Sequence, residues 1–434
     1  MKYYSTNNPK AFVSLQEAVV KGLAPDRGLY MPEEIKTLSD SFFKNIADLS
    51  LPEIAKTVAN SFFGNDIPED QLSNIVEETL NFEIPLVKVE EGIYVLELFH
   101  GPTFAFKDVG ARFMARMLSY FVKEQKQDDV NVLVATSGDT GSAVANGFLG
   151  VKGIKVFVLY PSGKVSDIQE AQFTTLGQNI TAIEIDGTFD DCQTLVKTAF
   201  LDRELNDQMN LTSANSINVA RFLPQSFYYF YAYAQLAKQN PTKDVVISVP
   251  SGNLGNLTAG LFAKRMGLPV KRFIAANNRN DVFFNYLKTG EYNPKPSVQT
   301  IANAMDVGDP SNFDRILDLY VHNHSAVTKD ISGYTFSDQQ IEKTIHIVYE
   351  KTGYLLDPHA ACGYLALKET RQDNESGIFL ATAHPAKFKA TVEKCIGKTI
   401  EIPDGLKAFM KHEKKTVSCS NDFEAFKEVL TTGG

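Results

Sequence analysis

One lysine stands at the end of an apolar stretch, directly before a helical pattern. Lys107 closes the stretch HGPTFAFK (100–107), and apolar residues in 109–121 then recur at helical spacing. An amine at such a boundary is partly desolvated, and desolvation favours its neutral form. A neutral lysine amine can attack an aldehyde and form an imine. The alternative, which the local pattern alone favours, is a surface lysine at a helix start.

Two glycine-rich turns of the same form can bind an anion. The turns SGDTG (137–141) and SGNLGN (251–256) each follow an apolar strand and open a helix. Such a turn aims backbone N–H groups and a helix N-terminus at one point. Many βα loops carry a glycine for steric reasons alone, so neither turn is decisive. Two of them at the carboxyl ends of parallel strands predict a ligand cleft.

A third polar turn, ATAHPAKF (381–388), follows the apolar run GIFL. Its place at a strand end suggests that it faces the same cleft, with His384 as a structural histidine rather than a base. His322 and His324 lie in a loop, and no other ligand type stands near them at metal-binding spacing. The sequence therefore predicts no metal site.

Several function classes lose support from missing motifs and from charge. Neither glycine turn has the form G-x-G-x-x-G, and Gly163-Lys164 lacks the rest of a Walker A loop. The 52 acidic residues exceed the 43 basic ones, which gives a net charge of -9 and argues against a general nucleic-acid or membrane-surface binder. No apolar run reaches the ~20 residues of a membrane helix. With no signal-like N-terminus and only four cysteines, we expect a cytoplasmic protein.

The elements that must position these residues form an alternating pattern. Residues 1–95 are expected to be mainly helical, and from about residue 87 apolar strands alternate with helices, which predicts an α/β fold with parallel sheets. The segment 213–238 is expected to be helical and, with its aromatic stretch FYYFYAY (227–233), to form a buried core helix. The predicted strands are VNVLVA (130–135), KVFVLYP (155–161), NITAIEIDG (179–187), DVVISVP (244–250), KRFIAANN (271–278) and GIFL (377–380).

Six segments, in order along the chain, give the sequence a family resemblance. They are GLAPDRGLYMPE (22–33), ELFHGPTFAFKDVGARF (97–113), VATSGDTGSAVA (134–145), NSINVARFLPQ (215–225), VPSGNLGN (249–256) and ATAHPAKF (381–388). The sequence resembles the threonine synthase family of pyridoxal 5′-phosphate enzymes of fold type II, in its microbial and fungal branch. The resemblance covers nearly the whole chain.

This resemblance implies two α/β lobes with mostly parallel sheets. We place a mainly helical segment at 1–95 and a smaller lobe, with Lys107 and the SGDTG turn, at 96–235. A larger lobe, with the SGNLGN turn and Thr382, follows at 236–434. The two lobes of this fold can exchange chain segments, so these boundaries are approximate.

The resemblance also implies site roles. Lys107 would hold the cofactor through an imine bond and then serve as acid and base. Thr382 would hydrogen-bond the pyridine nitrogen. Ser137, Asp139 and Thr140 would lie by the substrate carboxylate and the cofactor's ring hydroxyl. The cofactor phosphate would rest on the backbone amides of Gly252, Asn253, Leu254, Gly255 and Asn256.

The family's substrate is O-phospho-L-homoserine, and its products are L-threonine and phosphate. The implied reaction is loss of the γ-phosphate followed by addition of water at Cβ, a lyase reaction of threonine biosynthesis. A leaving phosphate needs cations and short polar donors. The candidates are Lys164, Ser216, Asn218 and Arg221. We expect a monomer or a homodimer.

Three other functions remain open from the sequence. Another fold type II enzyme, such as a serine or threonine dehydratase, would share Lys107 and the SGNLGN turn. A non-catalytic protein of the same fold would need neither, and the intact site residues argue against it. A nucleotide-binding module would use the two glycine turns, but its fingerprints are missing.

Overall fold

The larger of two mostly parallel sheets has six strands. The computed structural model describes residues 1–125, 130–239 and 244–432. In this sheet the strands run in the order β12-β11-β10-β13-β5-β4, and every neighbouring pair except β4 with β5 is parallel. The strands are β4 (Leu86–Glu90), β5 (Ile93–Glu97), β10 (Asp244–Pro250), β11 (Val270–Asn277), β12 (Ile331–Thr335) and β13 (Glu375–Ala381).

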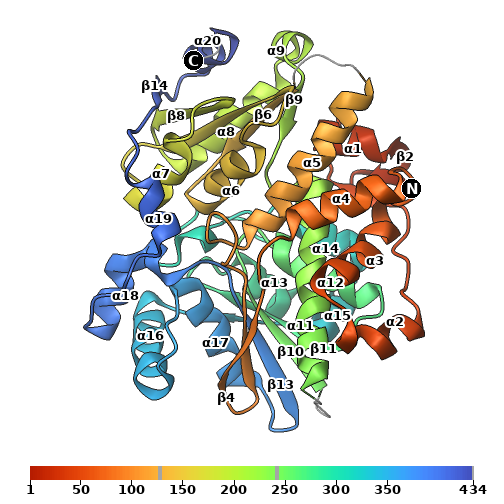
Figure 1. Ribbon diagram of the computed structural model, residues 1–434, viewed down its shortest axis with the longest axis vertical. Helices are drawn as coiled ribbons and strands as arrows, with labels where there is room; N and C mark the ends of the chain where they lie inside the picture. The colour runs from red at the N-terminus through yellow and green to blue at the C-terminus, as the bar shows by residue number, and fades with distance from the viewer. Residues whose placement is uncertain (126–129, 240–243, 433–434) are drawn as a thin grey trace.

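The smaller sheet has five strands, all parallel, in the order β14-β8-β7-β6-β9. Figure 1 shows it in the upper part of the molecule, with α6, α7 and α8 around it, above the larger sheet. The strands are β6 (Val130–Ala135), β7 (Ile154–Pro161), β8 (Ile180–Asp186), β9 (Leu211–Ser213) and β14 (Val417–Ser420). The predicted α/β class with two lobes and mostly parallel sheets is confirmed.

Helices follow most strands and cover both sheets. Those that carry or brace the site are α5 (Lys107–Gln125), α6 (Asp139–Phe148), α7 (Asp167–Thr174), α10 (Val219–Phe222), α11 (Ser226–Lys238), α12 (Gly255–Arg265), α14 (Phe313–Leu319), α17 (Pro358–Thr370) and the short η4 (Pro385–Phe388). The others are α1 (Leu15–Lys21), α2 (Asp40–Asn45), η1 (Ile46–Asp48), α3 (Leu51–Phe63), α4 (Glu69–Thr79), α8 (Phe189–Leu201), α9 (Arg203–Gln208), η2 (Leu223–Gln225), α13 (Val282–Thr289), η3 (Asn303–Met305), α15 (His324–Asp330), α16 (Asp338–Thr352), α18 (Lys389–Ile396), α19 (Asp404–Phe409) and α20 (Phe423–Thr432).

The aromatic helix α11 lies in the core, as its sequence predicts, but it begins at Ser226 and not near residue 213. The shorter α10 and η2 precede it, and Pro224 in η2 lacks the backbone N–H that a continuous helix needs. Phe227, Tyr228, Tyr229 and Phe230 are all at most 1% exposed. A helix that is apolar on most sides needs cover on most sides. In α11 this cover comes from the N-terminal helix α3, from η1 and from α12.

The N-terminal segment contains a small sheet that the sequence analysis did not predict. Strands β1 (Lys2–Ser5), β2 (Asn8–Ser14) and β3 (Tyr30–Pro32) form an antiparallel sheet in the order β2-β1-β3. Strand β2 is exposed along most of its length, so it lacks the apolar alternation that marks a half-buried strand. The helices expected in residues 1–95 are present as α1, α2, α3 and α4.

The two lobes exchange chain segments. Strands β4 and β5, from the segment placed N-terminal, belong to the larger sheet, and β14 from the C-terminal end joins the smaller sheet beside β8. The predicted division of the chain at residues 95 and 235 remains a prediction. The strands of each sheet do not all come from one of its three ranges. No helix within the described ranges has the length and apolar character that crossing a membrane requires.

Candidate active site

Lys107 is the first residue of α5, and the loop before it is clamped to the turn after β13. The backbone N–H of Phe106 donates to the Thr382 carbonyl at 2.9 Å, and that of His384 donates to the Phe104 carbonyl at 3.1 Å. These bonds bring together two segments far apart in the sequence. The turn 381–388 therefore lies beside Lys107, as its position after a strand predicts.

The amine of Lys107 has the electrostatics that imine chemistry needs. Burial is the main cause that lowers its pKa to about 8, and Arg221 and Lys387 lower it further, while Asp139 opposes them. Its Nζ lies 5.8 Å from the centre of the Phe106 ring. Within the described part of the chain, no hydrogen-bond or ion-pair partner holds this Nζ. The amine is thus available to react near neutral pH.

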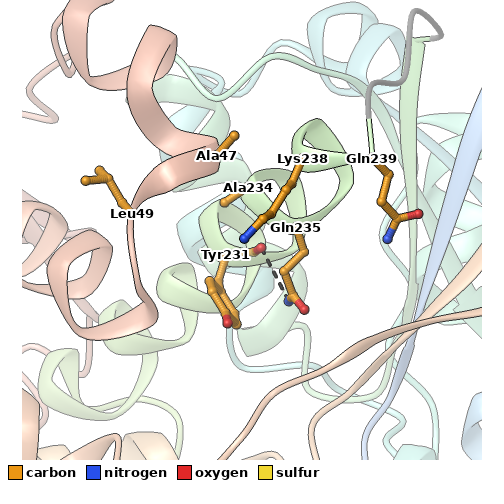
Figure 2. A pocket seen from close by; sticks show the side chains of 7 residues that line it. All are labelled: Ala47, Leu49, Tyr231, Ala234, Gln235, Lys238 and Gln239. Atoms are coloured by element: carbon orange, nitrogen blue, oxygen red, sulfur yellow. Dashed lines mark hydrogen bonds between the residues drawn. The ribbon is translucent and has the colours of Figure 1, made fainter.

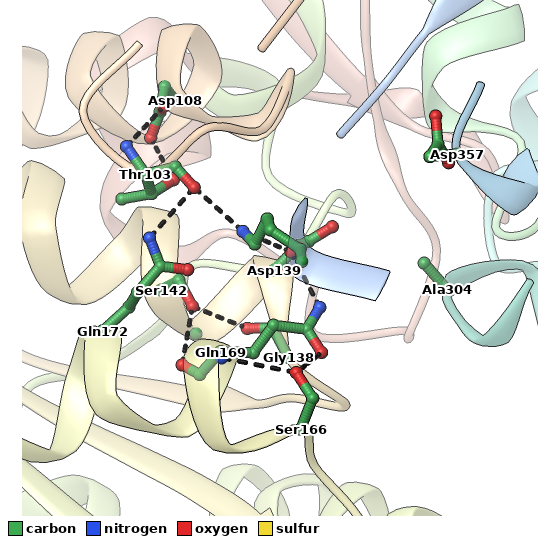
Figure 3. Close-up of polar contacts among 12 residues, drawn as sticks. Thr103, Asp108, Gly138, Asp139, Ser142, Ser166, Gln169, Gln172, Ala304 and Asp357 are labelled. Atoms are coloured by element: carbon green, nitrogen blue, oxygen red, sulfur yellow. Dashed lines mark hydrogen bonds and ion pairs between the residues drawn. The ribbon is translucent and has the colours of Figure 1, made fainter. Parts of the chain in front are cut away.

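Asp139 in the SGDTG turn forms a buried ion pair with Lys387. The Nζ of Lys387 lies 2.5 Å from Asp139 Oδ1, and both side chains are at most 4% exposed. Gln169 Nε2 donates to the same oxygen at 2.9 Å (Figure 3). Burial alone would raise the pKa of Asp139, but Lys387 and Lys107 outweigh burial and lower it to about 2. Asp139 is therefore a carboxylate near the reactive amine.

The sequence analysis did not assign a role to Lys387, although it quoted the motif that contains it. A lysine in a turn usually reads as exposed, and only the fold shows that this one is buried. Besides its pairing with Asp139, its Nζ donates to the Thr103 carbonyl at 2.8 Å. The Thr103 side chain in turn donates to Asp108, next to Lys107, at 2.5 Å (Figure 3). Lys387 thereby ties the SGDTG turn to the Lys107 segment.

His384 is structural, as the sequence analysis suggested. Its ring packs edge-on against Phe99 and Phe104, with centroid distances of 5.2 and 5.8 Å, and its Nδ1 accepts from the Ala386 N–H at 3.1 Å. Burial lowers the pKa of His384 to about 4, so the ring is neutral at physiological pH.

The SGNLGN turn forms the tight cradle that its glycines predict. A Cβ on Gly252 would lie 2.9 Å from the Ala304 carbonyl oxygen, so only glycine fits there. Leu254 is in the left-handed region at φ 61° and caps α12. A non-glycine residue in this region is strained, and such strain collects at ligand sites. The backbone N–H groups of the first turn of α12 lie at this cradle.

Adjacent tyrosines of α11 connect this cradle to the Lys107 segment. The Tyr229 hydroxyl lies 2.8 Å from Asn256 Oδ1, and the Tyr228 hydroxyl donates to the Phe106 carbonyl. Asn256 is 6% exposed, and within the described ranges its Nδ2 has no hydrogen-bond partner. A buried amide donor without an acceptor, beside a helix N-terminus, fits an anion such as a cofactor phosphate.

Arg221 is buried at 2% exposure, and its Nε and Nη1 have no hydrogen-bond partner among the residues that the structure describes. It lies against α5, because a Cβ on Gly110 would meet the Arg221 carbonyl at 2.4 Å. Burial lowers its pKa to about 10, which still leaves it a cation at neutral pH. Burying guanidinium donors without partners costs several kcal/mol, and a bound ligand that accepts their hydrogen bonds removes this cost. Arg221 is therefore a candidate for binding an anion.

Three hydroxyls predicted to meet cofactor or substrate have no internal partner. The side chains of Ser137, Thr140 and Thr382 make no hydrogen bond to any residue that the structure describes. Ser137 and Thr140 are partly exposed at the start of α6, and Thr382 is 7% exposed. All three remain free to bind a ligand.

Three of the predicted phosphate ligands have a different setting from Arg221. Lys164 is exposed in the turn after β7. Asn218 caps α10 and donates to the Val19 carbonyl at 2.9 Å, so its amide is used internally. Ser216 lies against the SGNLGN turn.

Two surface hollows lie away from this group of residues. One, of about 290 Å³, opens between η1 and α11 (Figure 2), and the other, of about 470 Å³, lies at the N-terminal end of β7. Neither is lined by any residue of the candidate site. We therefore place the candidate site at the glycine turns and not at either hollow.

Comparison with known proteins shows what this arrangement belongs to. Residues 78–380 match the family model of pyridoxal-phosphate-dependent enzymes, 2–80 match the threonine synthase N terminus, and 360–430 match the threonine synthase C-terminal region. The chain is 45% identical over 430 residues to threonine synthase of Haemophilus influenzae, and the match covers 99% of each.

The chain belongs to the threonine synthase family. The crystal structure of threonine synthase from Escherichia coli superposes with a TM-score of 0.94 at 42% identity, and covers 100% of both chains. A pyridoxal-phosphate-bound threonine synthase from Brucella melitensis gives a TM-score of 0.92 at 35% identity, and covers 100% of this chain and 99% of its own. As a member of this family, the chain is a pyridoxal-phosphate-dependent lyase of threonine biosynthesis.

Proposed function

We propose that this chain converts O-phospho-L-homoserine and water into L-threonine and phosphate. The observation that carries the proposal is a lysine amine with a depressed pKa beside a buried arginine whose donors are unpaired. A serine or threonine dehydratase also needs the lysine amine, but its substrate carries no phosphate group for the arginine to bind. Arg221 therefore favours a substrate that carries phosphate.

The candidate site fits pyridoxal phosphate. Lys107 would bond to the aldehyde carbon, residues 252–256 would hold the phosphate, and the Thr382 hydroxyl would meet the ring nitrogen. When bound, the cofactor supplies an electron sink for the charge left by a removed α-proton. The Nδ2 of Asn256, which has no partner among the described residues, supports this placement.

Lys107 would move the protons. Its amine is neutral over part of the physiological range, because its pKa is about 8, and one such group can serve alternately as base and acid. The Asp139 carboxylate would hold charge opposite this amine. Ser137 and Thr140, with free hydroxyls at the N-terminal end of α6, would bind the substrate carboxylate.

Arg221 would bind the phosphate that leaves. Its Nε and Nη1 are buried donors without a partner among the described residues, and a charged donor of this kind binds a phosphate oxygen strongly. Exposed Lys164 and internally bonded Asn218 are weaker candidates. The four cysteines form no disulfide, which supports work in the cytoplasm.

The test uses Lys107→Ala, with the exposed Lys10→Ala as a matched control. We expect Lys107→Ala to lower threonine formation by about 10³-fold, because the general acid and base is lost. Lys10→Ala should behave like the wild type. Phosphate release is measured with phosphohomoserine, and oxo-acid formation with threonine.

Two results would contradict the proposal. One is normal turnover of phosphohomoserine by Lys107→Ala. The other is a wild-type protein that deaminates threonine but releases no phosphate, which would indicate a dehydratase.

A further inference from the structure

Ser216 lies directly over the first residue of α12, in the SGNLGN turn. A Cβ on Gly255 would lie 3.2 Å from the Ser216 Cβ and 3.6 Å from its Oγ. The Oγ accepts two hydrogen bonds, from Asn253 Nδ2 at 2.9 Å and from Asn312 Nδ2 at 3.1 Å. The hydroxyl is thus part of the cradle rather than of the Arg221 site.

The orientation of both amides is fixed by groups that can only donate. Asn253 Oδ1 accepts from the Ser311 backbone N–H at 2.6 Å, and Asn312 Oδ1 accepts from Arg315 Nη1 at 2.7 Å. A backbone N–H and a guanidinium have no acceptor atom, so each must face an amide oxygen. Each amide NH₂ group must then face Ser216.

Two amide donors occupy both lone pairs of the Ser216 oxygen. A hydroxyl has two acceptor positions and one donor proton. With both acceptor positions filled, the proton must point to another acceptor, and the described residues offer Ser216 Oγ none. The group is therefore an obligatory donor at the N-terminal end of α12, where an anion is favoured.

Arg315 anchors this arrangement from below. It is fully buried on α14, and its Nη1 also donates to the Ser216 carbonyl at 3.0 Å. Its Nη2 donates to the carbonyls of Ile217 and Tyr30, and the guanidinium stacks 4.0 Å from the Phe222 ring centre. With so many fixed partners, the guanidinium holds Asn312 in one orientation.

We propose that Ser216 donates a hydrogen bond to the phosphate of bound pyridoxal phosphate, and that Asn312 and Arg315 are positioning residues that fix its direction. The inference rests on the proposed cofactor site. It moves Ser216 from the substrate phosphate, where the sequence analysis put it, to the cofactor phosphate.

The first test titrates the full chain with pyridoxal phosphate and, separately, with pyridoxal, which lacks the phosphate. Ser216→Ala should weaken pyridoxal phosphate binding about tenfold or more, as expected for a lost hydrogen bond to a charged group. Pyridoxal affinity and the KM for phosphohomoserine at saturating cofactor should not change. Buried Ser226, whose hydroxyl donates to the Leu223 carbonyl, gives the control Ser226→Ala, which should bind both ligands like the wild type.

Two outcomes would overturn the role of Ser216. A raised KM with unchanged pyridoxal phosphate affinity would return it to the substrate phosphate. Equal weakening of pyridoxal and pyridoxal phosphate would show a merely structural role. If the affinities change as expected but the wild-type protein forms no threonine, the proposed function is wrong and the role of Ser216 still stands.

The second test asks whether Asn312 acts through Ser216. In Asn312→Asp an oxygen replaces Nδ2, so the Ser216 proton turns toward position 312 and away from the ligand. We expect Asn312→Asp to weaken pyridoxal phosphate binding, and Ser216→Ala to cost at most about twofold more in that background. The added charge cancels in this comparison, since both chains carry it. A full tenfold further loss would overturn the positioning role.

Discussion

At the scale of single residues, the reactivity of Lys107 comes from opposing charges. Burial, Arg221 and Lys387 all favour the neutral amine, while the Asp139 carboxylate favours the ammonium. The balance leaves the pKa near 8, low enough for reaction and high enough for the amine to carry a proton. Desolvation is the largest of these effects.

This balance predicts how cofactor capture depends on pH. Below about pH 8 the rate at which the cofactor-free chain bonds covalently to pyridoxal phosphate should fall about tenfold per pH unit, because only the neutral amine reacts. Above that pH it should level off. Asp139→Asn removes the charge that raises the pKa of Lys107, so the midpoint should move to lower pH. Borohydride trapping over a pH series measures both, and an unmoved or raised midpoint would contradict this account.

At the scale of elements, one buried ion pair joins the two lobes. Lys387 belongs to η4, after a strand of the larger sheet, and Asp139 opens α6 beside the smaller sheet. Both side chains are almost fully shielded from water, so each charge is stabilised mainly by the opposite charge of its partner. The pair holds the ends of two strands from different sheets at one place.

Removing one member should therefore cost more than removing both. Lys387→Met should lower the free energy of unfolding by about 3–5 kcal/mol, because it strands a buried carboxylate. Adding Asp139→Leu should recover a large part of that loss. Lys56→Met, which breaks the exposed pair with Glu77 at 2.5 Å, should cost about 1 kcal/mol or less. Urea unfolding measures all three, and equal losses for Lys387→Met and Lys56→Met would refute the argument.

The strands whose side chains are mostly apolar, and the glycine turns that follow them, can be predicted from the sequence. Strands such as β6 and β10 are mostly apolar and almost entirely buried, and the glycines of the SGNLGN turn after β10 can be read directly from the sequence. The exposed strand β2 gives no such signal. Partners across the fold are also beyond local pattern, since Lys387 pairs with a residue roughly 250 positions earlier and nothing around it marks its burial.

At the scale of the whole molecule, the C-terminal end completes the smaller lobe. Strand β14 pairs in parallel with β8, and α20 buries Phe426 and Leu430 against the cluster that contains Ile185. The last helix and Cys419 of β14 therefore belong to a core whose other buried members lie at residues 133–211. Figure 1 shows α20 and β14 beside β8, in the upper part of the molecule.

This placement gives a local stability prediction. Phe426→Ala should lower the free energy of unfolding of the smaller lobe by about 3–5 kcal/mol, because it empties a fully buried site. Amide hydrogen exchange should accelerate in β8 and change little in β10. The partly exposed Phe423 supplies the control Phe423→Ala, with a smaller effect. Equal acceleration in both sheets would contradict a lobe-specific role.

The pairing of β8 with β14 also bears on how the protein is made. Roughly 230 residues separate the two strands. At about 5–20 residues per second, a ribosome needs about 10–45 s to synthesise these intervening residues. Throughout that time the nascent chain has an open edge at β8, ready to pair with a neighbouring polypeptide. Slow translation of the 3′ half of the message should thus raise the yield of aggregates, measured as the insoluble fraction after synthesis, and chaperones that cover this edge should lower it.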